Sequence, residues 1–383
     1  MPKSTNQARK SEMGFWIVYL LVGTLCSAIG GYALSSNAGY PFWASAGIYG
    51  AFLLSWLALP AIWHWQHRNI LPPRLYNFVF RIGYLLFGAA FLLTALLVLR
   101  NMGWYAAYIF GLNVPSPFTE SAVRAANAIT LAITALCCFY ALYAAQKLPR
   151  VRHYQYCDAR IKRPLKLLVI SDWHINRTIS PQKVAARAEF FNSLKPDIML
   201  LPGDIADDNV EATRAQLKVL KKLRAPLGIY YTVGNHEAYN YAPAWEAAFA
   251  ALGWRVLHNS GVAAEDSGIY IGGVPDASTF GANVGQALKA ATPEQYRILL
   301  SHTPTIMAQI PDGRVDLTVA GHTHGGQIFP FNFLTKFGNN GFVAGEYRLN
   351  NTVLLVSRGA GYWGPPLRLF APSDVIMVEL LPN

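Results

Sequence analysis

The chain has 383 residues, of which 53% are hydrophobic and 14% are charged. This composition is too apolar for an ordinary soluble protein and too charged for a bundle of membrane helices alone. The net charge of +11 arises within the first 166 residues, because residues 167–383 hold 17 basic and 18 acidic residues. A nucleic-acid partner therefore has little support.

Four long apolar segments precede residue 147, and each approaches the length of about 20 residues that a helix needs to cross a bilayer. They span residues 15–34, 42–63, 82–99 and 125–145. The first is too long for the core of a signal peptide and is followed by another apolar segment. We therefore expect residues 1–146 to form an all-α domain of four transmembrane helices.

Basic residues lie before the first apolar segment, between the second and third, and after the fourth, whereas the loop between the first two carries no charge. The positive-inside rule then predicts that both termini and the domain after the spans are cytoplasmic, in a bacterial inner membrane. Residues 147–164 are interpreted as a basic juxtamembrane linker. Anionic lipid would attract such a linker at about 1 kcal/mol per basic residue, but membrane topology alone explains its charge equally well.

From residue 165 onwards, short apolar runs alternate with helical stretches, which is typical of an α/β layered domain. Strands are predicted at residues 165–170, 198–201, 228–233, 269–274, 297–300 and 317–320. One helix is predicted from Ser180-Pro181, a good helix start, to about Leu194, and another from about Val210 to Leu223. We expect this domain to cover residues 165–383.

Polar motifs follow five of the apolar runs. They are Asp172-Trp173-His174, Gly203-Asp204-Ile205-Ala206-Asp207, Gly234-Asn235-His236-Glu237, Ser301-His302 and Gly321-His322-Thr323-His324-Gly325-Gly326-Gln327. Ligands of open α/β sheets bind beyond the carboxyl ends of strands, and imidazole is the commonest metal ligand among side chains. Each motif alone has a simpler explanation as a turn, a loop or a core histidine. Five of them in succession favour one site.

The series D-x-H, G-D-x-x-D, G-N-H-E, a lone His and G-H-x-H resembles the calcineurin-like metallophosphoesterase family over roughly residues 165–383. Residues 325–327, 357–359 and 365–369 resemble the membrane-associated branch, which includes bacterial envelope phosphoesterases and transmembrane proteins with a metallophosphoesterase domain. The resemblance implies an α-β-β-α sandwich of two mixed sheets with a binuclear metal centre. Asn176 stands where many members have glycine, which puts no ligand in doubt.

The resemblance also implies a role for each motif residue. Asp172, His174 and His324 would bind one metal, Asn235, His302 and His322 the other, and Asp204 would bridge the two. This mixture of imidazole and oxygen ligands suits two divalent ions of Mn, Fe or Zn. A hydroxide held between the metals would attack phosphorus, while His236 protonates the leaving oxygen and Asp207 orients His236.

Three further residues are assigned less direct roles. Glu237 is expected to support the site rather than to catalyse. Arg358 and Arg368 are candidates for contact with a substrate phosphate, and pairing within the fold is the alternative for both.

A substrate that is itself embedded in a membrane would explain the four spans. The aromatic stretch 329–334, with Phe337 and Phe342, is interpreted either as core or as a lip among lipid headgroups. We hypothesise a metal-dependent phosphoric ester or anhydride hydrolase that acts on a lipid-linked substrate, with membrane lipids as partners. The resemblance suggests UDP-diacylglucosamine or a phospholipid. The alternatives are a soluble substrate, such as a cyclic nucleotide or a phosphoprotein, and a non-catalytic membrane sensor that binds phosphate.

Overall fold

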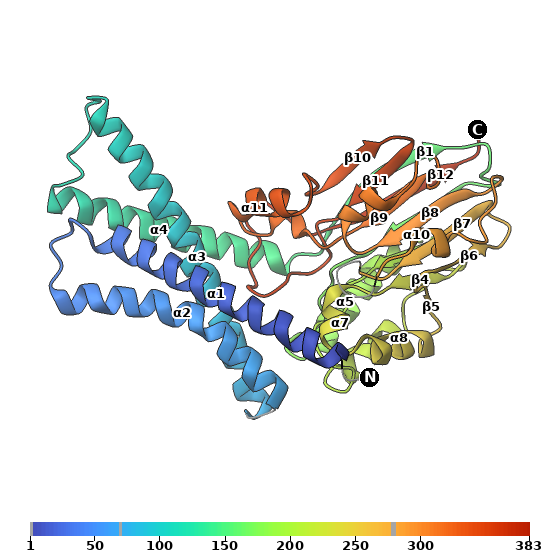
Figure 1. Ribbon diagram of the computed structural model, residues 1–383, viewed down its shortest axis with the longest axis horizontal. Helices are drawn as coiled ribbons and strands as arrows, with labels where there is room; N and C mark the ends of the chain where they lie inside the picture. The colour runs from blue at the N-terminus through green and yellow to red at the C-terminus, as the bar shows by residue number, and fades with distance from the viewer. Residues whose placement is uncertain (1–2, 69–70, 277–280) are drawn as a thin grey trace. The chain divides into compact units, whose positions relative to one another are not determined.

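The computed structural model describes residues 3–68, 71–276 and 281–383 (Figure 1). The chain divides into two compact units, which we call the helical unit and the sheet unit. The helical unit comprises residues up to Leu142 together with Gly364–Leu367. The sheet unit comprises Tyr143–Trp363 and Arg368–Asn383.

The helical unit is built from four long helices. They are α1 (Lys3–Ser35), α2 (Phe42–Arg68), α3 (Pro73–Ile109) and α4 (Glu120–Gln146). All four contain a stretch long and apolar enough to cross a membrane, which confirms the four predicted spans. The helices extend beyond the predicted apolar segments, and α3 runs from Pro73 to Ile109.

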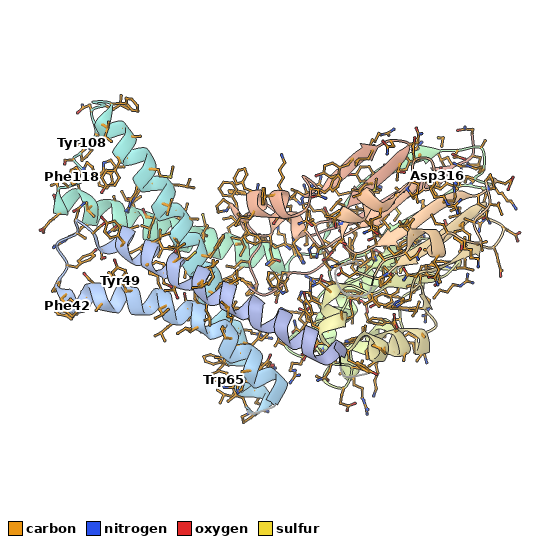
Figure 2. The ribbon with its side chains drawn as sticks, in the orientation of Figure 1. Phe42, Tyr49, Trp65, Tyr108, Phe118 and Asp316 are labelled. Atoms are coloured by element: carbon orange, nitrogen blue, oxygen red, sulfur yellow. The ribbon has the colours of Figure 1, made fainter. Side chains whose placement is uncertain are left out.

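Aromatic and small residues mark the ends and contacts of these helices. Phe42, Tyr108 and Phe118 lie exposed near one end of the helical unit (Figure 2), as expected for aromatic residues at a membrane interface.

Helices α1 and α2 pack closely at Gly30, where an added Cβ would lie 2.7 Å from the Phe52 ring. Small residues commonly allow such close approach between membrane helices.

The sheet unit contains two six-stranded sheets. The first has the order β1-β12-β2-β3-β4-β5, and the second has the order β10-β11-β9-β8-β7-β6. The strands of the first sheet are β1 (Arg150–Cys157), β2 (Leu165–Val169), β3 (Ile198–Pro202), β4 (Ile229–Thr232), β5 (Arg255–Val256) and β12 (Asp374–Leu381). Those of the second are β6 (Ser260–Ala264), β7 (Ile269–Val274), β8 (Tyr296–Ser301), β9 (Leu317–Ala320), β10 (Gly345–Leu349) and β11 (Thr352–Val356).

The two sheets stack face to face between helices. Leu167 and Val169 of β2 belong to a core shared with residues of the second sheet, such as Ile298. Leu168, one residue along β2, faces the other way and packs in a core with Phe191 of α5 (Pro181–Ser193). Because side chains alternate along a strand, each sheet is buried on both faces. This confirms the predicted α-β-β-α sandwich.

The remaining helices cover the outer faces of the sheets or lie in the loops between strands. They are α6 (Arg214–Leu220), α7 (Asn235–Tyr239), α8 (Ala242–Ala251), α10 (Val284–Ala287), α11 (Phe331–Gly338) and the 3₁₀ helices η1 (Pro304–Gln309) and η2 (His324–Gly326). Helix α5 begins after Ser180, as predicted, and the Ser180 side chain accepts a hydrogen bond from the Lys183 N–H. Helix α6 begins at Arg214 instead of residue 210, because the Asn209 side chain accepts from the Ala212 N–H and holds the preceding residues in a turn.

The segment predicted as a juxtamembrane linker, residues 147–164, contains a strand that the sequence did not predict. Residues 150–157 form β1, which pairs in parallel with β12 from the Arg150–Asp374 pair to the Cys157–Leu381 pair. The many charged and exposed residues of this segment are explained by its position at the edge of the sheet, where one side of the strand is unpaired.

Candidate metal centre

The predicted site residues follow the carboxyl ends of five strands, and the structure brings their polar atoms together. Asp172 and His174 follow β2, Asp204 and Asp207 follow β3, Asn235 and His236 follow β4, His302 follows β8, and His322 and His324 follow β9. Strands β2, β3 and β4 are parallel neighbours in one sheet, and β8 and β9 are parallel neighbours in the other. The two sheets therefore deliver their loops to one shared edge.

A first group of ligand atoms comes from Asp172, His174 and His324. The Nε2 atoms of His174 and His324 lie 2.8 Å apart. The Nε2 atom of His324 is 3.4 Å from Oδ1 of Asp172. All three side chains are buried, and their ligand atoms lie within 4.8 Å of one another. These are the residues predicted for the first metal.

A second group comes from Asn235, His302 and His322. Oδ1 of Asn235 lies 2.9 Å from Nε2 of His302 and 3.2 Å from Nδ1 of His322. The two histidine nitrogens are 3.3 Å apart. These are the residues predicted for the second metal, so the two histidines of the G-H-x-H motif divide between the two groups.

Asp204 lies between the two groups. Its Oδ2 atom is 3.1 Å from Nε2 of His302 in the second group and 3.9 Å from Nε2 of His174 in the first. A single carboxylate oxygen thus faces both sets of ligands. This is the position that a bridging ligand requires.

The chemistry of these side chains fits divalent metal ions. Imidazole nitrogens and carboxylate oxygens are ligands that divalent metals accept, and buried carboxylates are costly without a compensating positive charge. Burial lowers the pKa of His324 to about 4, which keeps the ring neutral, the form that binds metals. Burial lowers the pKa of His302, but the negative charge of Asp204 outweighs burial and raises the pKa of the ring well above its ordinary value. A metal would therefore replace a proton at Nε2 of His302, the nitrogen that faces Asp204.

The backbone at the ligands adopts an unusual conformation. Asp172, His174, Asp204, His322 and His324 all have φ between 50° and 71°. This left-handed region is rare for residues other than glycine, asparagine and aspartate, and its strain concentrates at functional sites. The glycines of the motifs leave the space that this geometry needs, since a Cβ at Gly234 would collide with the Asp204 carboxylate.

His236 and Asp207 form a pair at the rim of the two groups. Nδ1 of His236 is 2.9 Å from Oδ1 of Asp207, and its Nε2 is 3.9 Å from Oδ2 of Asp204. Burial lowers the pKa of His236, but Asp204 and Asp207 outweigh burial and raise it to about 9. The two carboxylates thus favour the cationic form of the ring, which can donate a proton from Nε2. The same Asp207 oxygen also contacts Nδ1 of His174, a relationship that the motif spacing did not indicate.

Glu237 supports the site, as expected. Its Oε1 atom accepts hydrogen bonds from the N–H groups of Ile205 and Ala206, and its Oε2 atom accepts from those of Asp204 and Gly234. Burial, followed by the charge of Asp204, raises the pKa of Glu237 to about 7, and the N–H donors oppose this rise. The buried carboxylate ties the loop after β3 to the loop after β4.

Arg368 pairs within the fold, which was the alternative to contact with a substrate phosphate. Its side chain is 1% exposed, and its guanidinium donates to the carbonyl oxygens of Gly361, Ala371 and His324. Its Nη2 atom also lies 3.0 Å from Nδ1 of His324. These contacts place Arg368 behind a metal-ligand candidate, where it fixes the ring. Sequence patterns do not reveal these contacts, because most of the partners are backbone atoms.

Arg358 and Gln327 complete the surroundings of the site. Arg358 is partly exposed, pairs with Asp374 at 3.1 Å and lines a cavity beside Gly325. The Gln327 side chain accepts from the Trp363 N–H and donates to the Trp363 carbonyl, which holds that residue in place. The Trp363 ring centre is 6.0 Å from that of His236. The conspicuous Gly-Gly-Gln after His324 was the available signal for this contact.

Comparison with known proteins agrees with the geometry. Residues 165–326 match the family model described as calcineurin-like phosphoesterase. The chain is 32% identical over 242 residues to an uncharacterized metallophosphoesterase of Helicobacter pylori, covering 61% of this chain and 65% of that protein. It is 30% identical over 271 residues to the transmembrane protein with metallophosphoesterase domain of Danio rerio, covering 66% and 62%.

A third relative is matched over most of its length. It is an uncharacterized metallophosphoesterase of Aquifex aeolicus, 31% identical over 231 residues, which cover 56% of this chain and 85% of that protein. The chain spans slightly less than two thirds of the length of the Helicobacter and Danio relatives. Together with the four apolar helices, these matches show that the chain is a membrane protein of the calcineurin-like phosphoesterase family.

Proposed function

We propose that this protein is a metal-dependent hydrolase that cleaves a phosphodiester or pyrophosphate bond in a lipid-linked substrate. The observation that carries the chemistry is the position of Asp204 between two groups of ligands, with the His236–Asp207 pair beside them. A module that only binds phosphate needs no proton donor at this place. The His236 cation therefore favours catalysis over sensing.

The residues divide the work of hydrolysis between them. Asp172, His174 and His324 would hold one divalent ion, Asn235, His302 and His322 would hold a second, and Asp204 would contact both. Such ions polarise a phosphoryl group and lower the pKa of water. His236 would donate the proton on Nε2 to the leaving oxygen, and Asp207 would keep the Nδ1 proton in place and the ring correctly oriented.

The aromatic stretch after the last motif supports a lipid-linked substrate. The structure buries Phe342, so the interpretation as core is correct for that residue. Phe333, Leu334 and Phe337, all on α11, are 63%, 63% and 91% exposed. We call these three residues the α11 lip. A cluster of exposed apolar side chains commonly marks a surface for protein or membrane contact.

The chain connection supports the same substrate class. Helix α4 ends at Gln146 and strand β1 begins at Arg150, so very little chain separates a membrane helix from the sheet unit. The site is thereby confined to the vicinity of a bilayer, where lipid phosphoesters are concentrated. The distribution of basic residues supports a cytoplasmic position for the sheet unit.

The test compares lipid and soluble substrates. The purified protein would be loaded with Mn²⁺ and given vesicles of bacterial lipid extract, vesicles doped with UDP-diacylglucosamine, or soluble diesters such as bis-4-nitrophenyl phosphate and cyclic AMP. We expect a water-soluble phosphorylated product from a lipid, and its loss with EDTA. Faster turnover of cyclic AMP than of any lipid would contradict the lipid assignment, and no turnover of any of them would contradict catalysis.

A further inference from the structure

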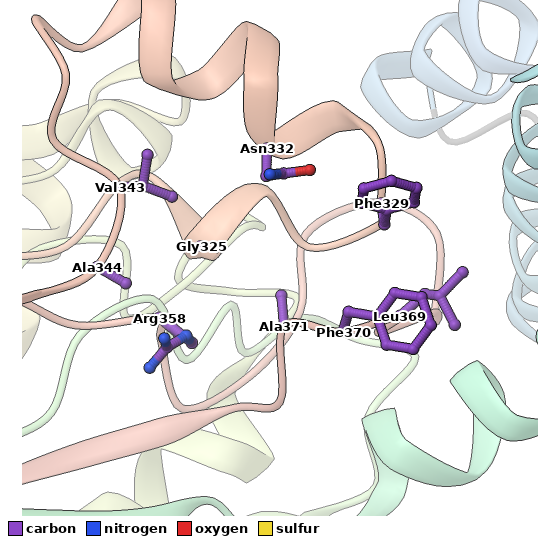
Figure 3. Close-up of a pocket in the computed structure, with 9 residues that line it drawn as sticks. All are labelled: Gly325, Phe329, Asn332, Val343, Ala344, Arg358, Leu369, Phe370 and Ala371. Carbon is purple, nitrogen blue, oxygen red and sulfur yellow. The ribbon is translucent and has the colours of Figure 1, made fainter.

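The sheet unit contains a cavity of about 290 Å³ next to the proposed metal centre (Figure 3). Its lining includes Gly325, which directly follows the ligand candidate His324. The volume has room for roughly ten groups of the size of water, at about 30 Å³ each. None of the residues assigned to the metals or to proton transfer lines this cavity, so the hydrolytic machinery leaves it without a role.

The lining is polar on one side and apolar on the other. Arg358 lies against Gly325, where an added Cβ would be 2.9 Å from Cγ of the arginine. In the view of Figure 3, Phe329 and Leu369 lie across the cavity from Arg358. A cation next to the metal ligands and an apolar wall farther away match the two ends of an amphiphile whose anionic head sits at the metals.

Asn332 adds a polar atom that the protein does not use. Its Oδ1 atom is buried and has no hydrogen-bond partner among the described residues, although the residue lines the cavity. A buried polar atom without a partner is unfavourable, so a ligand that donates a hydrogen bond there would bind more favourably. A hydroxyl or amide N–H near the head of an amphiphile is such a donor.

The apolar wall continues onto the surface at Phe370. This side chain is 74% exposed, and its backbone has φ of 61°, a rare conformation for a bulky residue. Its ring centre lies 5.9 Å from that of Phe329, which in turn lies 5.9 Å from that of Phe333 in the α11 lip. The aromatic side chains thus run from the cavity to the exposed lip without interruption.

We propose that this cavity is the subsite for the alkyl chain of an amphiphilic phosphoester, with Arg358 at the boundary between its head and its chain. The inference rests on the proposed function for the position of the phosphate, and it adds where the rest of the substrate lies. The chain would run from the metal centre past Arg358 and along the surfaces of Phe329 and Phe370 towards the lip.

Binding of alkylphosphonates tests the subsite without relying on turnover. The full chain would be placed in nanodiscs of zwitterionic lipid, and the affinities of methylphosphonate and octylphosphonate would be measured by calorimetry. Because burying a methylene is worth about 0.8 kcal/mol, even two buried methylenes give about tenfold tighter binding of the octyl compound. The matched pair of variants is Ala344→Trp, which fills the cavity, and Ala290→Trp, which adds the same volume on the exposed surface.

We expect Ala344→Trp to bring the ratio of the two affinities close to one and Ala290→Trp to preserve it. Arg358→Met should weaken both phosphonates, and Arg358→Lys should restore part of the loss. A ratio near one in the wild type, or a ratio that survives Ala344→Trp, would overturn the subsite. Binding of octylphosphonate through the cavity without hydrolysis of any ester would sink the proposed function alone, whereas hydrolysis without chain-length preference would sink the subsite alone.

Discussion

The Oδ1 atom of Asp207 contacts Nδ1 of both His236 and His174, so one carboxylate oxygen holds the proposed proton donor and a metal-ligand candidate together. The two rings meet edge to face, with centres 4.7 Å apart. The proposed proton transfer and the proposed metal binding would therefore depend on a common residue. This coupling separates the expected effects of substitutions at His236 and at Asp207.

Replacing His236 should remove the proton donor and leave the metals. We expect His236→Ala to lower kcat on a lipid phosphoester by about 10²–10⁴-fold, the usual contribution of general acid catalysis. Metal content, measured by inductively coupled plasma mass spectrometry, should match the wild type, because no proposed ligand is lost. His258→Ala is the control, since His258 pairs with Glu246 on the surface. Turnover of His236→Ala at the wild-type rate would refute the assignment.

Replacing Asp207 should affect both the proposed proton donation by His236 and the proposed metal binding by His174. Asp207→Asn keeps the size of the side chain but removes the charge that both histidines face. Loss of a residue that orients a metal ligand commonly costs 10–100-fold in metal affinity. We expect lower kcat together with weaker metal binding in a competition titration with a fluorescent chelator. Unchanged metal affinity would show that Asp207 acts through His236 alone.

Replacing Glu237 should loosen two loops at once. Both carboxylate oxygens accept two backbone N–H groups each, and the amide nitrogen of a glutamine cannot accept any. We expect Glu237→Gln to lower the free energy of unfolding of the sheet unit by about 2–4 kcal/mol, since two buried donors lose their acceptor. Thermal unfolding followed by near-UV circular dichroism measures this. Glu211→Gln, at an exposed pair with Arg214, should change the midpoint little.

Metal binding should stabilise the protein measurably. The ligand candidates are buried and crowded, and an ion that binds only the folded state adds about 2.7 kcal/mol at a concentration one hundred times its Kd. We expect the unfolding midpoint to rise with Mn²⁺ and to fall with EDTA. Asp204→Asn should reduce this response, because Asp204 faces both groups. Asp312 is exposed, so Asp312→Asn should retain the metal-dependent shift of the midpoint. An equal loss of this shift in both variants would count against the bridging role of Asp204.

The α11 lip should matter only at a membrane. Replacing Phe333 and Phe337 by serine removes two exposed aromatic side chains that would enter the headgroup layer. We expect the ratio of activity on vesicles to activity on a soluble diester to fall by about tenfold or more, given about 1.5–3 kcal/mol for each buried phenylalanine. An unchanged ratio of the two activities would contradict a contact between the α11 lip and lipid.

The convergence of the motif residues at strand ends could be predicted because it depends on local patterns, whereas the sandwich and the division of ligands between two metals were expected from the resemblance to the family. Apolar runs mark β2, β3, β4, β8 and β9, and the polar residues that follow them are adjacent in sequence to the strand ends. The sequence could not decide between the two alternatives for Arg368, because its position depends on carbonyl groups of residues that carry no side-chain signal, such as Gly361 and Ala371. The exposure of the α11 lip also could not be decided, since an aromatic run fits a core as well as a surface.

Strand β1 was missed for a further reason. A basic segment with alternating exposure lacks the apolar character of a central strand, and its partner is far away in the chain. Only the fold reveals that residues 374–381 lie between β1 and β2. Pairings between distant segments are set by tertiary packing, which local sequence patterns do not report.

The insertion of β12 between β1 and β2 sets an order for synthesis of the protein on the ribosome. Strand β1 ends at Cys157 and leaves the ribosome soon after the fourth membrane helix, but the strand that joins it to the sheet begins only at Asp374. During translation of the residues between β1 and β12, strand β1 has no partner strand, and β2 lacks β12 as a neighbour. A nascent chain released before Asp374 would therefore be anchored in the membrane with its first sheet incomplete. Chaperones and membrane proteases would encounter that intermediate until β12 pairs with β1 and β2 and completes the first sheet.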